Sequence, residues 1–342
     1  NVLNFVFNFD NFVLLKWNTM KNYNTFLKLC LALLVITLIS CSEDSSNPAG
    51  PNPLETGNTG DLKLFVIDTA KVNTISMIGT NEATILNKLV NTSSYIAGFS
   101  LSPDGKKFVY VNHQMTGQYP NFTTVNEIRV AKTDGTGDTK IYDLLNNQKY
   151  VDALRYCSDG KIFFTLFENY PANTSETFLM KDDGTGLENE DYNGKLLDAT
   201  DNRNYYLPQS TSGVQIIDPT MDNGAGGVYY SENITDPDNM KGGEFTNDGK
   251  YAVIPFKDGN AIKARIIDVV AKTSSTMLLV SNLPSDWIYY TLHMASDSKR
   301  GVITLSGGDY IKSKTYVFNS KTGIVNAPFE NNDDTVSSVF AW

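Results

Sequence analysis

The chain has 342 residues, of which 41% are hydrophobic, with 28 Lys and Arg against 38 Asp and Glu. The first 40 residues contain three Lys and one Asp, so the remainder has 25 basic and 37 acidic residues and a net charge of −12. Nucleic acids and anionic membrane surfaces carry the same sign of charge, and neither is expected as a partner.

The first 40 residues have the features of a leader. Asn1–Thr19 lacks an initiator Met and is rich in Asn and Phe, and we interpret it as translated upstream sequence, with a long n-region as the alternative. In residues 20–40, the basic Lys21 and Lys28 precede the apolar run Leu29–Ile39. Because about 20 apolar residues are needed to cross a bilayer, this shorter run predicts a signal peptide.

The end of the apolar run resembles the lipobox of bacterial lipoproteins. Leu38-Ile39-Ser40-Cys41 places an aliphatic residue, a variable residue and a small residue before a Cys. The resemblance implies cleavage after Ser40 and acylation of Cys41 by lipid chains such as palmitate. Several acyl chains on one residue would anchor the protein stably. The alternative is an ordinary secreted protein whose signal ends near a Cys.

A polar linker follows the lipobox. Ser42-Glu43-Asp44 is similar to the acidic tag of surface-exposed lipoproteins of the Bacteroidota. Residues 41–61 are rich in Ser, Pro and Gly and predict a flexible tether. We therefore expect a cell-envelope protein attached to the outer membrane through Cys41, and the sequence leaves open whether it faces the periplasm or the cell surface.

A short turn phrase recurs five times in the rest of the chain. The copies are "SPDGK", "CSDGK", "ATDNR", "TNDGK" and "ASDSK", with Asp104, Asp159, Asp201, Asp248 and Asp297 as their aspartates. Asp bonds its own backbone and Gly or Asn accepts the left-handed conformation, so each copy predicts a tight turn between strands. The aspartates lie 42 to 55 residues apart, a spacing typical of β-propellers. In the fifth copy, Ser298 departs from the Gly preference.

Strands are predicted on both sides of these turns. Inner strands precede the turns at "YIAGFSL", "VDALRYC", "KLLDAT", "KGGEFT" and "YYTLHMA", and "SSVFAW" ends the chain in the same register. Six outer hairpins fill the other positions, the first at Leu62–Ile78. The chain thus opens with an outer hairpin and closes with an inner strand, which predicts that the two ends share one blade and close the ring. That blade lacks an obvious second strand, and the sequence leaves its completeness open.

The turn phrase, together with the outer turns "TDGTG" and "DDGTG", resembles the repeat of TolB-like propellers over about Leu62–Trp342. The resemblance implies an all-β fold with six blades in residues 62–342, with five or seven blades as the alternative. No α/β domain precedes the repeats and the chain carries a lipidation signal, which TolB lacks. The role of TolB in the Tol-Pal system is therefore not carried over.

Few residues are candidates for catalysis or metal binding. The chain has two histidines, and it has no Gly-x-Ser-x-Gly elbow, P-loop or dinucleotide fingerprint. His293 falls on a predicted inner strand and is a candidate for the central channel. Turn capping explains the repeated aspartates, so no metal, cofactor or catalytic residue is assigned. Cys157 lies in an apolar strand pattern and is expected to be buried and inert.

Two aromatic clusters are candidates for a binding surface. One contains Tyr205 and Tyr206, and the other contains Trp287, Tyr289 and Tyr290. Such side chains stack on sugars or peptides, although aromatic residues in strands also form blade cores. Trp287 follows Pro284 in a predicted loop and is expected to be exposed.

These observations favour a non-enzymatic envelope lipoprotein whose propeller binds a protein or glycan through its loops or central mouth. The alternative is a polysaccharide lyase or hydrolase with its site in the channel around His293. A purely structural role in envelope assembly is a third hypothesis. The sequence identifies neither the partner nor the oligomeric state.

Overall fold

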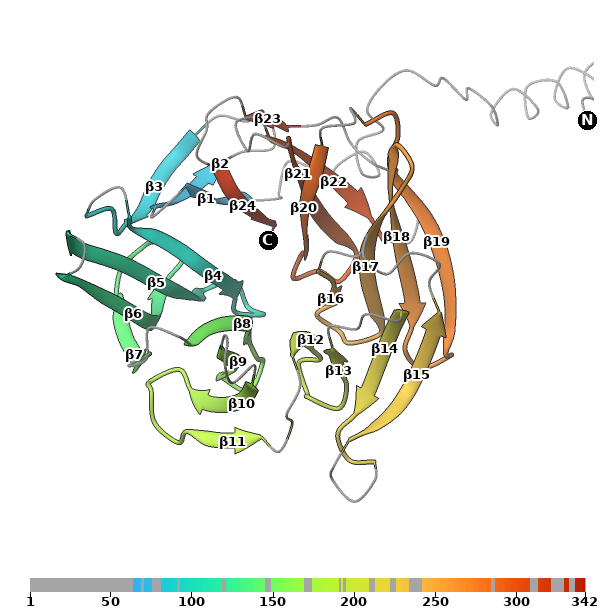
Figure 1. Cartoon of the computed structure of the whole chain (residues 1–342), viewed down its shortest axis with the longest axis horizontal. Helices are drawn as coiled ribbons and strands as arrows, with labels where there is room; N and C mark the ends of the chain where they lie inside the picture. Colours follow the sequence, from blue (N-terminus) through green and yellow to red (C-terminus); the bar gives the residue numbers. More distant parts are fainter. Residues whose placement is uncertain are drawn as a thin grey trace, which may run out of the picture. The chain divides into compact units, whose positions relative to one another are not determined.

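Six four-stranded antiparallel sheets surround a central axis in the computed structural model (Figure 1). The structure describes residues 64–68, 71–75, 81–90, 93–118, 121–144, 149–168, 174–190, 192, 195–208, 213–221, 226–233, 242–283, 287–307, 313–320, 329–331 and 336–341. The sheets are the blades of a β-propeller, which confirms the predicted all-β fold with six blades. Within these residues, no helix is long and apolar enough to span a membrane.

Each blade has an inner strand at the axis and an outer strand at the rim, and its strands are named from the axis outward. Blade 1 has β24 (Val336–Ala341), β1 (Leu64–Asp68), β2 (Lys71–Ile75) and β3 (Asn81–Asn87). Blade 2 has β4 (Tyr95–Leu101), β5 (Lys107–Gln118), β6 (Asn121–Lys132) and β7 (Thr139–Asp143). Blade 3 has β8 (Lys149–Tyr156), β9 (Lys161–Glu168), β10 (Thr174–Lys181) and β11 (Glu188–Glu190).

The other three blades follow the same order. Blade 4 has β12 (Leu196–Ala199), β13 (Tyr206–Pro208), β14 (Gly213–Asp218) and β15 (Gly227–Asn233). Blade 5 has β16 (Glu244–Phe245), β17 (Tyr251–Asp258), β18 (Ala261–Asp268) and β19 (Thr273–Val280). Blade 6 has β20 (Trp287–Met294), β21 (Arg300–Gly307), β22 (Ser313–Asn319) and β23 (Phe329–Asn331).

Blade 1 combines strands from both ends of the propeller sequence. β24 pairs antiparallel with β1, with Leu64 opposite Ala341, which confirms the predicted closure of the ring. The assignment of the first hairpin was wrong, however, because β1 and β2 are the second and third strands of the blade. The outermost strand is β3, which the sequence pattern did not reveal, and the blade is therefore complete. Middle and outer hairpins both consist of a strand, a polar turn and a strand, so their pattern alone does not distinguish them.

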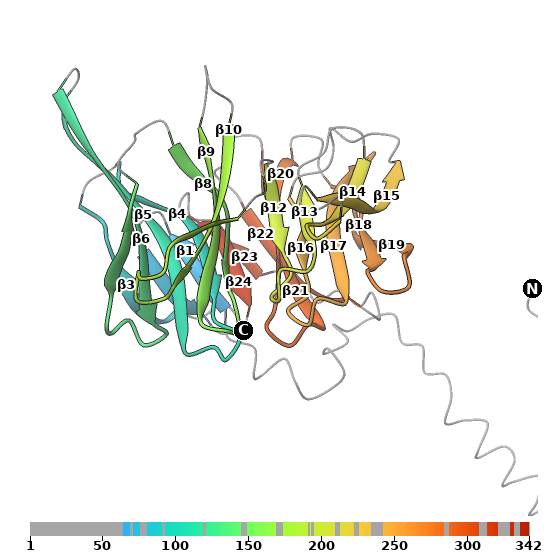
Figure 2. The ribbon, with the colours of Figure 1, turned by 90° about the horizontal axis from the view of Figure 1, so that it is seen from below.

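The two faces of the ring carry different connections. The tight turns between first and second strands and between third and fourth strands lie on one side, which we call the turn face. The hairpins between second and third strands and the connections to the next blade lie on the opposite side, which we call the loop face. The β5–β6 hairpin stands out beyond the loop face (Figure 2). Leu64 lies at the turn end of β1, because its partner Ala341 ends an inner strand.

The repeated phrase forms the inner turns, as predicted. In the first copy, the Gly105 N–H donates to the Ser102 carbonyl at 2.8 Å, and Asp104 Oδ1 accepts from the Lys106 N–H at 3.1 Å. In the fifth copy, Ser298 has a φ of 58° and takes the place of the glycine. Its N–H donates to the Ala295 carbonyl at 3.1 Å, so the turn forms without Gly.

The third turn is shifted by one residue from the predicted alignment. Asn202, and not Asp201, caps the turn, because its Oδ1 accepts from the Asn204 N–H at 3.1 Å. Asp201 instead accepts a hydrogen bond from the Ser158 N–H of the preceding blade at 2.6 Å. Asn caps a turn as Asp does, so the "DN" pair allowed two alignments, and the adjacent blade selects one of them.

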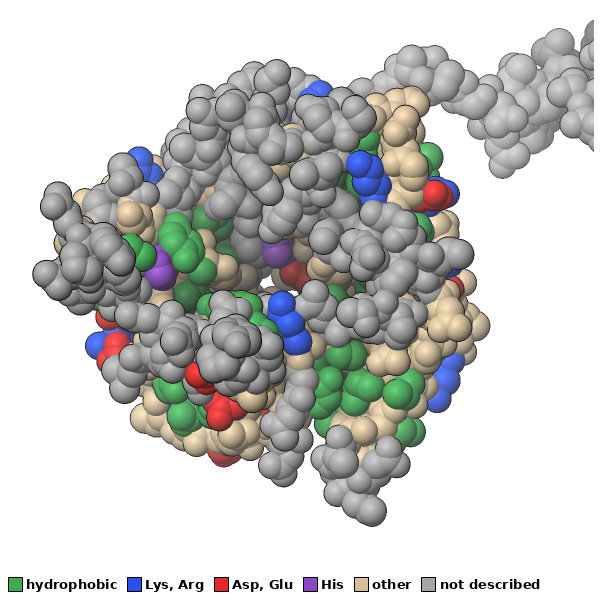
Figure 3. Space-filling model, viewed as in Figure 1, with side chains coloured by type: hydrophobic (Ala, Val, Ile, Leu, Met, Phe, Trp, Pro, Cys, Tyr) green, Lys and Arg blue, Asp and Glu red, His purple; other side chains and the backbone are tan. Residues whose placement is uncertain are grey.

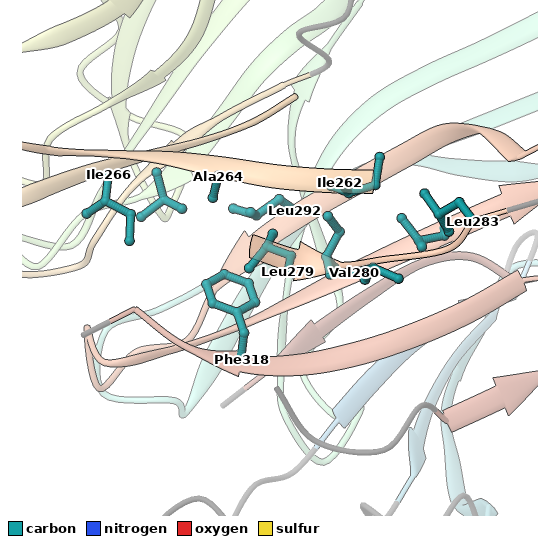
Figure 4. Close-up of a cluster of buried hydrophobic side chains, with 11 residues drawn as sticks. Ile262, Ala264, Ile266, Leu279, Val280, Leu283, Leu292 and Phe318 are labelled. Carbon is teal, nitrogen blue, oxygen red and sulfur yellow. The ribbon is translucent and has the colours of Figure 1, made fainter. Parts of the chain in front are cut away.

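The hydrophobic core lies between neighbouring blades. Strand alternation turns apolar side chains of each sheet toward the next sheet. Figure 4 shows one such cluster, in which Leu292 and Phe318 of blade 6 pack among residues of blade 5 such as Ile262 and Leu279. Full burial of each side chain of this size stabilises the folded state by about 1.5–3 kcal/mol relative to exposure to water. Cys157 is also buried, and burial raises its thiol pKa to about 11, which agrees with the predicted inert thiol.

Several predictions fall outside the described residues. They concern Asn1–Thr19, the signal peptide of residues 20–40, the lipobox Leu38-Ile39-Ser40, the lipidation site Cys41 and the tether up to residue 61. These stay predictions from the sequence.

Candidate functional site

The inner strands of blades 2 to 6 each place one polar residue at the same level of the central channel. In five blades this residue stands two positions before the first residue of the inner turn, and the five are Ser100, Arg155, Asp198, Glu244 and His293. They line a cavity toward the turn face, which Pro103, Asn247 and Ser296 of the turns border. We call these five residues the channel layer. Figure 3, which looks onto the loop face, shows a histidine and an acidic side chain on the wall of the central opening.

Arg155 and Asp198 form a buried ion pair between blades 3 and 4. Arg155 Nη1 lies 2.7 Å from Asp198 Oδ2, and the Asp198 residue is only 6% exposed. The same carboxylate oxygen accepts the Phe245 N–H at 2.8 Å, so it also contacts blade 5. Burial raises the pKa of Asp198 to about 6, with repulsion from Glu244 acting in the same direction and Arg155 opposing both.

Glu244 joins blades 5 and 6 in a similar way. Its Oε1 lies 2.5 Å from His293 Nδ1, and its Oε2 accepts the Met294 N–H at 2.8 Å. In blade 2, Ser100 Oγ accepts the Tyr156 N–H of blade 3 at 3.0 Å. Three members of the channel layer thus accept a backbone N–H from the next inner strand. The layer holds adjacent blades together, which accounts for its polar residues without catalysis.

The dimensions of the cavity limit what it can bind. Its volume is about 70 Å³, whereas one water needs about 10–15 Å³ and sites for larger ligands have about 300–1,000 Å³. The described part of the cavity therefore has room for a few waters or one small group. Among the described residues, no three His, Cys, Asp or Glu side chains are grouped as metal ligands.

The first aromatic cluster is divided between surface and core. Tyr205 is partly exposed on the turn face, and its ring lies 4.6 Å from that of Tyr229. A hydrogen bond to Tyr229, together with burial, raises the pKa of Tyr205 to about 12. Lys272 Nζ lies 3.7 Å from the Tyr229 ring centre. Tyr206 is only 1% exposed and packs against Phe163, so its ring belongs to the core and not to the surface.

The second aromatic cluster lies on a strand. Trp287, which was expected in a loop, is the first residue of β20 and pairs with Gly307. The run of aromatic and β-branched residues from Trp287 continues the strand pattern, which explains the earlier start. Tyr289 and Tyr290 lie on the same inner strand, opposite Ser306 and Leu305. The side chains of these three aromatic residues lie outside the described part of the structure.

The loop face carries two aromatic pairs that the sequence pattern did not single out. Tyr95, at the start of β4, is 43% exposed, and its ring lies 4.3 Å from that of His113. Tyr150, near the start of β8, is 37% exposed, and its ring lies 5.2 Å from that of Phe167. Lys195 Nζ lies 5.0 Å from the centre of the Phe167 ring.

These two pairs could have been found from the repeat. Tyr95 and Tyr150 each stand five residues before a channel-layer residue, Ser100 and Arg155 respectively. Adjacent inner strands therefore carry equivalent exposed tyrosines at their loop ends. Aromatic rings at such positions provide flat surfaces for stacking on a partner.

No protein-family model matches the chain, and no curated protein matches it in sequence. Solved structures share its fold. TolB from Acinetobacter baumannii superposes with a TM-score of 0.57 at 14% identity, over 82% of this chain and 66% of that one. A putative TolB from Agrobacterium tumefaciens superposes with a TM-score of 0.51 at 10% identity, over 82% of this chain and 96% of that one. A chain of the nidogen/laminin complex superposes with a TM-score of 0.53 at 11% identity, over 82% of this chain and 98% of that one. The chain thus spans just under two thirds of the Acinetobacter TolB chain and has a TolB-like propeller fold.

Proposed function

We propose that the protein is a lipid-anchored scaffold of the bacterial cell envelope whose propeller binds a protein or glycan partner without chemistry of its own. The observation that carries this proposal is the use of the channel layer. Arg155, Asp198 and Glu244 each contact a neighbouring blade, and these contacts join blades 3 to 6. These ionisable groups of the channel therefore stabilise the ring of blades. We assign binding of the partner to the outer surface of the propeller.

The loop face is the better candidate for the binding surface. Tyr95 and Tyr150 are exposed there on adjacent blades, and the connections on this face are free to vary in length on a rigid ring. The turn face consists of tight turns, several of which bond to the neighbouring blade, as Ser158 and Asp201 do. Leu64 also lies on that side, so the predicted tether joins the ring opposite the loop face.

The envelope location rests on the sequence. The lipobox ending at Cys41 implies outer-membrane attachment, and the tether of residues 41–61 separates the propeller from the bilayer. With about 22 residues between Cys41 and Leu64, a flexible chain has a root-mean-square span of about 25 Å. This span is long enough to let the propeller present its loop face to a soluble or membrane-bound partner.

The test is capture of a partner in intact cells, carried out with the full chain and with the double variant Tyr95→Ala and Tyr150→Ala. We expect the wild type to enrich a protein or glycan after crosslinking. The double variant should capture at least tenfold less of this partner. Tyr205→Ala on the turn face is the matched control and should retain capture. Equal capture by all three proteins would rule out the loop face, and capture by none would contradict the scaffold role.

A glycan-active enzyme is the second candidate, because Glu244 Oε1 lies 2.5 Å from His293 Nδ1 beside the cavity. A carboxylate that orients a histidine is a common catalytic arrangement. The purified protein should then depolymerise an envelope or host polysaccharide, and His293→Ala should abolish this activity while the Tyr205→Ala control keeps it. Our proposal expects no activity from any of these proteins.

A further inference from the structure

The β5–β6 hairpin of blade 2 is longer than the sheet to which it belongs. Both strands have 12 residues, whereas β4 pairs with β5 only up to His113 and β7 pairs with β6 only from Glu127. Residues Gln114–Gln118 and Asn121–Val125 therefore continue as a two-stranded ribbon, which projects beyond the loop face (Figure 2). We call this ribbon the arm.

One edge of the arm presents backbone groups to the outside. At its base, the Asn126 carbonyl accepts the Leu144 N–H at 2.8 Å and so points to the β7 side. Because orientation alternates along a strand, the N–H and C=O groups of Thr124 and Phe122 point to the same side. Within the described residues, no strand pairs with this side of Asn121–Val125. An open strand edge of this kind is a template for a further strand.

The arm has a physical reason to accept a third strand. A two-stranded ribbon is only marginally stable in water, and strand addition is a recurrent mode of peptide recognition. An apolar surface lies next to the arm, because the Gln114 side chain donates to the Lys88 carbonyl at 3.2 Å. The next two residues, Leu89 and Val90, are 46% and 62% exposed. Aliphatic side chains of this kind match the apolar side chains of a peptide better than the hydroxyl groups of a sugar.

Charge and connectivity narrow the occupant further. The chain after residue 40 has a net charge of −12, and such a field attracts cationic partners and repels anionic ones. The chain's own tether joins at Leu64 on the turn face, whereas the arm stands on the loop face. A separate basic polypeptide therefore fits this edge better than the tether or an acidic glycan does.

We propose that the arm is a docking strand, and that an extended basic segment of a partner protein pairs with the β6 edge at Asn121–Val125. The proposal rests on the scaffold function above and narrows its partner to a polypeptide. The contact would consist of main-chain hydrogen bonds to Phe122 and Thr124 on the outer edge of β6.

Two variants of the full chain test the arm. In the first, residues Met115–Thr124 are replaced by Asn-Gly, which joins the cross-strand partners Gln114 and Val125 through a two-residue turn. In the second, Thr124→Pro keeps the arm and removes one outward N–H that β5 does not use. Thermal midpoints within about 3 °C of the wild type would show that the propeller is intact in both.

The probes are three eight-residue synthetic peptides. One alternates Val and Lys, one alternates Val and Glu, and one is the Val/Lys peptide with N-methylated valines. Binding is measured by fluorescence polarisation, and hydrogen–deuterium exchange locates the contact. We expect the Val/Lys peptide to slow exchange at Phe122 and Thr124 at least tenfold, and to bind at least tenfold more tightly than either of the other peptides. Both variants should lose this binding.

Four results would overturn the proposal. They are equal binding to the arm-deleted variant, unchanged exchange in the arm, equal binding of the N-methylated peptide, and a concentration-dependent dimer that Thr124→Pro abolishes. The last result would assign the edge to a second copy of the chain. Crosslinking in cells separates this proposal from the scaffold function. Capture of the same partner by wild-type and arm-deleted chains would reject only the arm, whereas capture by neither would reject the scaffold function itself.

Discussion

The outer turn of blade 2 lies so close to blade 1 that a Cβ on Gly135 would be 1.7 Å from the carbonyl oxygen of Ile85. Similarly, a Cβ on Gly184 in blade 3 would be 2.7 Å from the carbonyl oxygen of Ile141 in blade 2. Both glycines belong to a "DGTG" turn and have positive φ. The outer turns are thus contacts between blades, and the glycine is required by close approach as well as by backbone conformation.

We therefore expect Gly135→Ala to destabilise the protein by about 3 kcal/mol or more, since left-handed backbone costs about 1–2 kcal/mol and the clash adds to it. Gly160→Ala is the matched control, because Gly160 has a φ of 78° and a Cβ at that position would have nothing within 4 Å. Its cost should be about 1–2 kcal/mol. Urea denaturation measures the free energy of unfolding of both variants. Equal decreases in the two variants would show that the contact with Ile85 is loose.

Asp198 gives the stability a defined pH dependence. Its pKa is about 6 in the folded protein and about 3.9 in an unfolded chain, so the folded state holds a proton that the unfolded state releases between about pH 4 and 6. The contribution of Asp198 to stability is complete below pH 4, falls as the pH rises through this window, and is constant above it. Denaturation curves recorded over a pH series give the slope of the free energy of unfolding against pH. Comparison with the same series for the Asp198→Asn variant isolates the part due to Asp198.

Arg155→Met should raise the pKa of Asp198 above 6, because Arg155 is the cation that opposes the effect of burial. At pH 8 the carboxylate would be buried without its partner, at a cost of about 3–5 kcal/mol. At pH 5 the side chain can take up a proton, and the cost should be smaller. Arg265→Met, which breaks the more exposed contact with Glu232 at 3.0 Å, is the control and should cost about 0–1 kcal/mol at both pH values.

The pairing of β24 with β1 predicts a large effect of truncation. Deletion of residues 336–342 would leave β1 as an open edge at the channel, and we expect a loss of several kcal/mol out of a total stability of about 5–15 kcal/mol. Deletion of residues 42–61, which the sequence predicts to be a flexible tether, is the control and removes more residues. Calorimetry should show a lower or broader transition for the first deletion only, and unchanged unfolding would contradict closure by these strands.

The proposed lipid anchor is tested by Cys41→Ser. We expect the wild type to incorporate a labelled fatty acid and the variant to incorporate none, because the variant has no thiol to acylate. Globomycin, which blocks lipoprotein signal cleavage, should cause the wild-type precursor to accumulate. A variant that incorporates as much fatty acid as the wild type, or a precursor that is processed normally in the presence of the drug, would reject the anchor.

Much of the fold could be predicted because a local signal repeats. The turn phrase combines a capping side chain with a residue of positive φ, and five copies at a steady spacing indicate a propeller before any contact is known. The shift at Asn202 and the difference between the predicted and observed strands of blade 1 have one cause. Where two alignments suit the local chemistry equally well, contacts with the neighbouring blade decide between them, as Asp201 and Ser158 show.

The channel layer was harder to predict, although its position in the repeat is constant. His293 was selected for its chemistry, whereas Arg155, Asp198 and Glu244 were not, because a charged residue in a strand is usually solvated. Their positions two residues before each turn place them on the axis. The exposed Tyr95 and the buried Tyr206 show the same limit, because burial depends on which blade covers each ring.

The central claim is that a partner docks on the loop face of a non-enzymatic ring, and site-specific photo-crosslinking in intact cells tests it most directly. A photoreactive residue is placed at Tyr95 or Tyr150 on the loop face, or at Lys106 or Asn204 on the turn face. We expect one common adduct from the first two positions and none from the other two. An adduct formed only from the turn face, or none from any position, would contradict the claim.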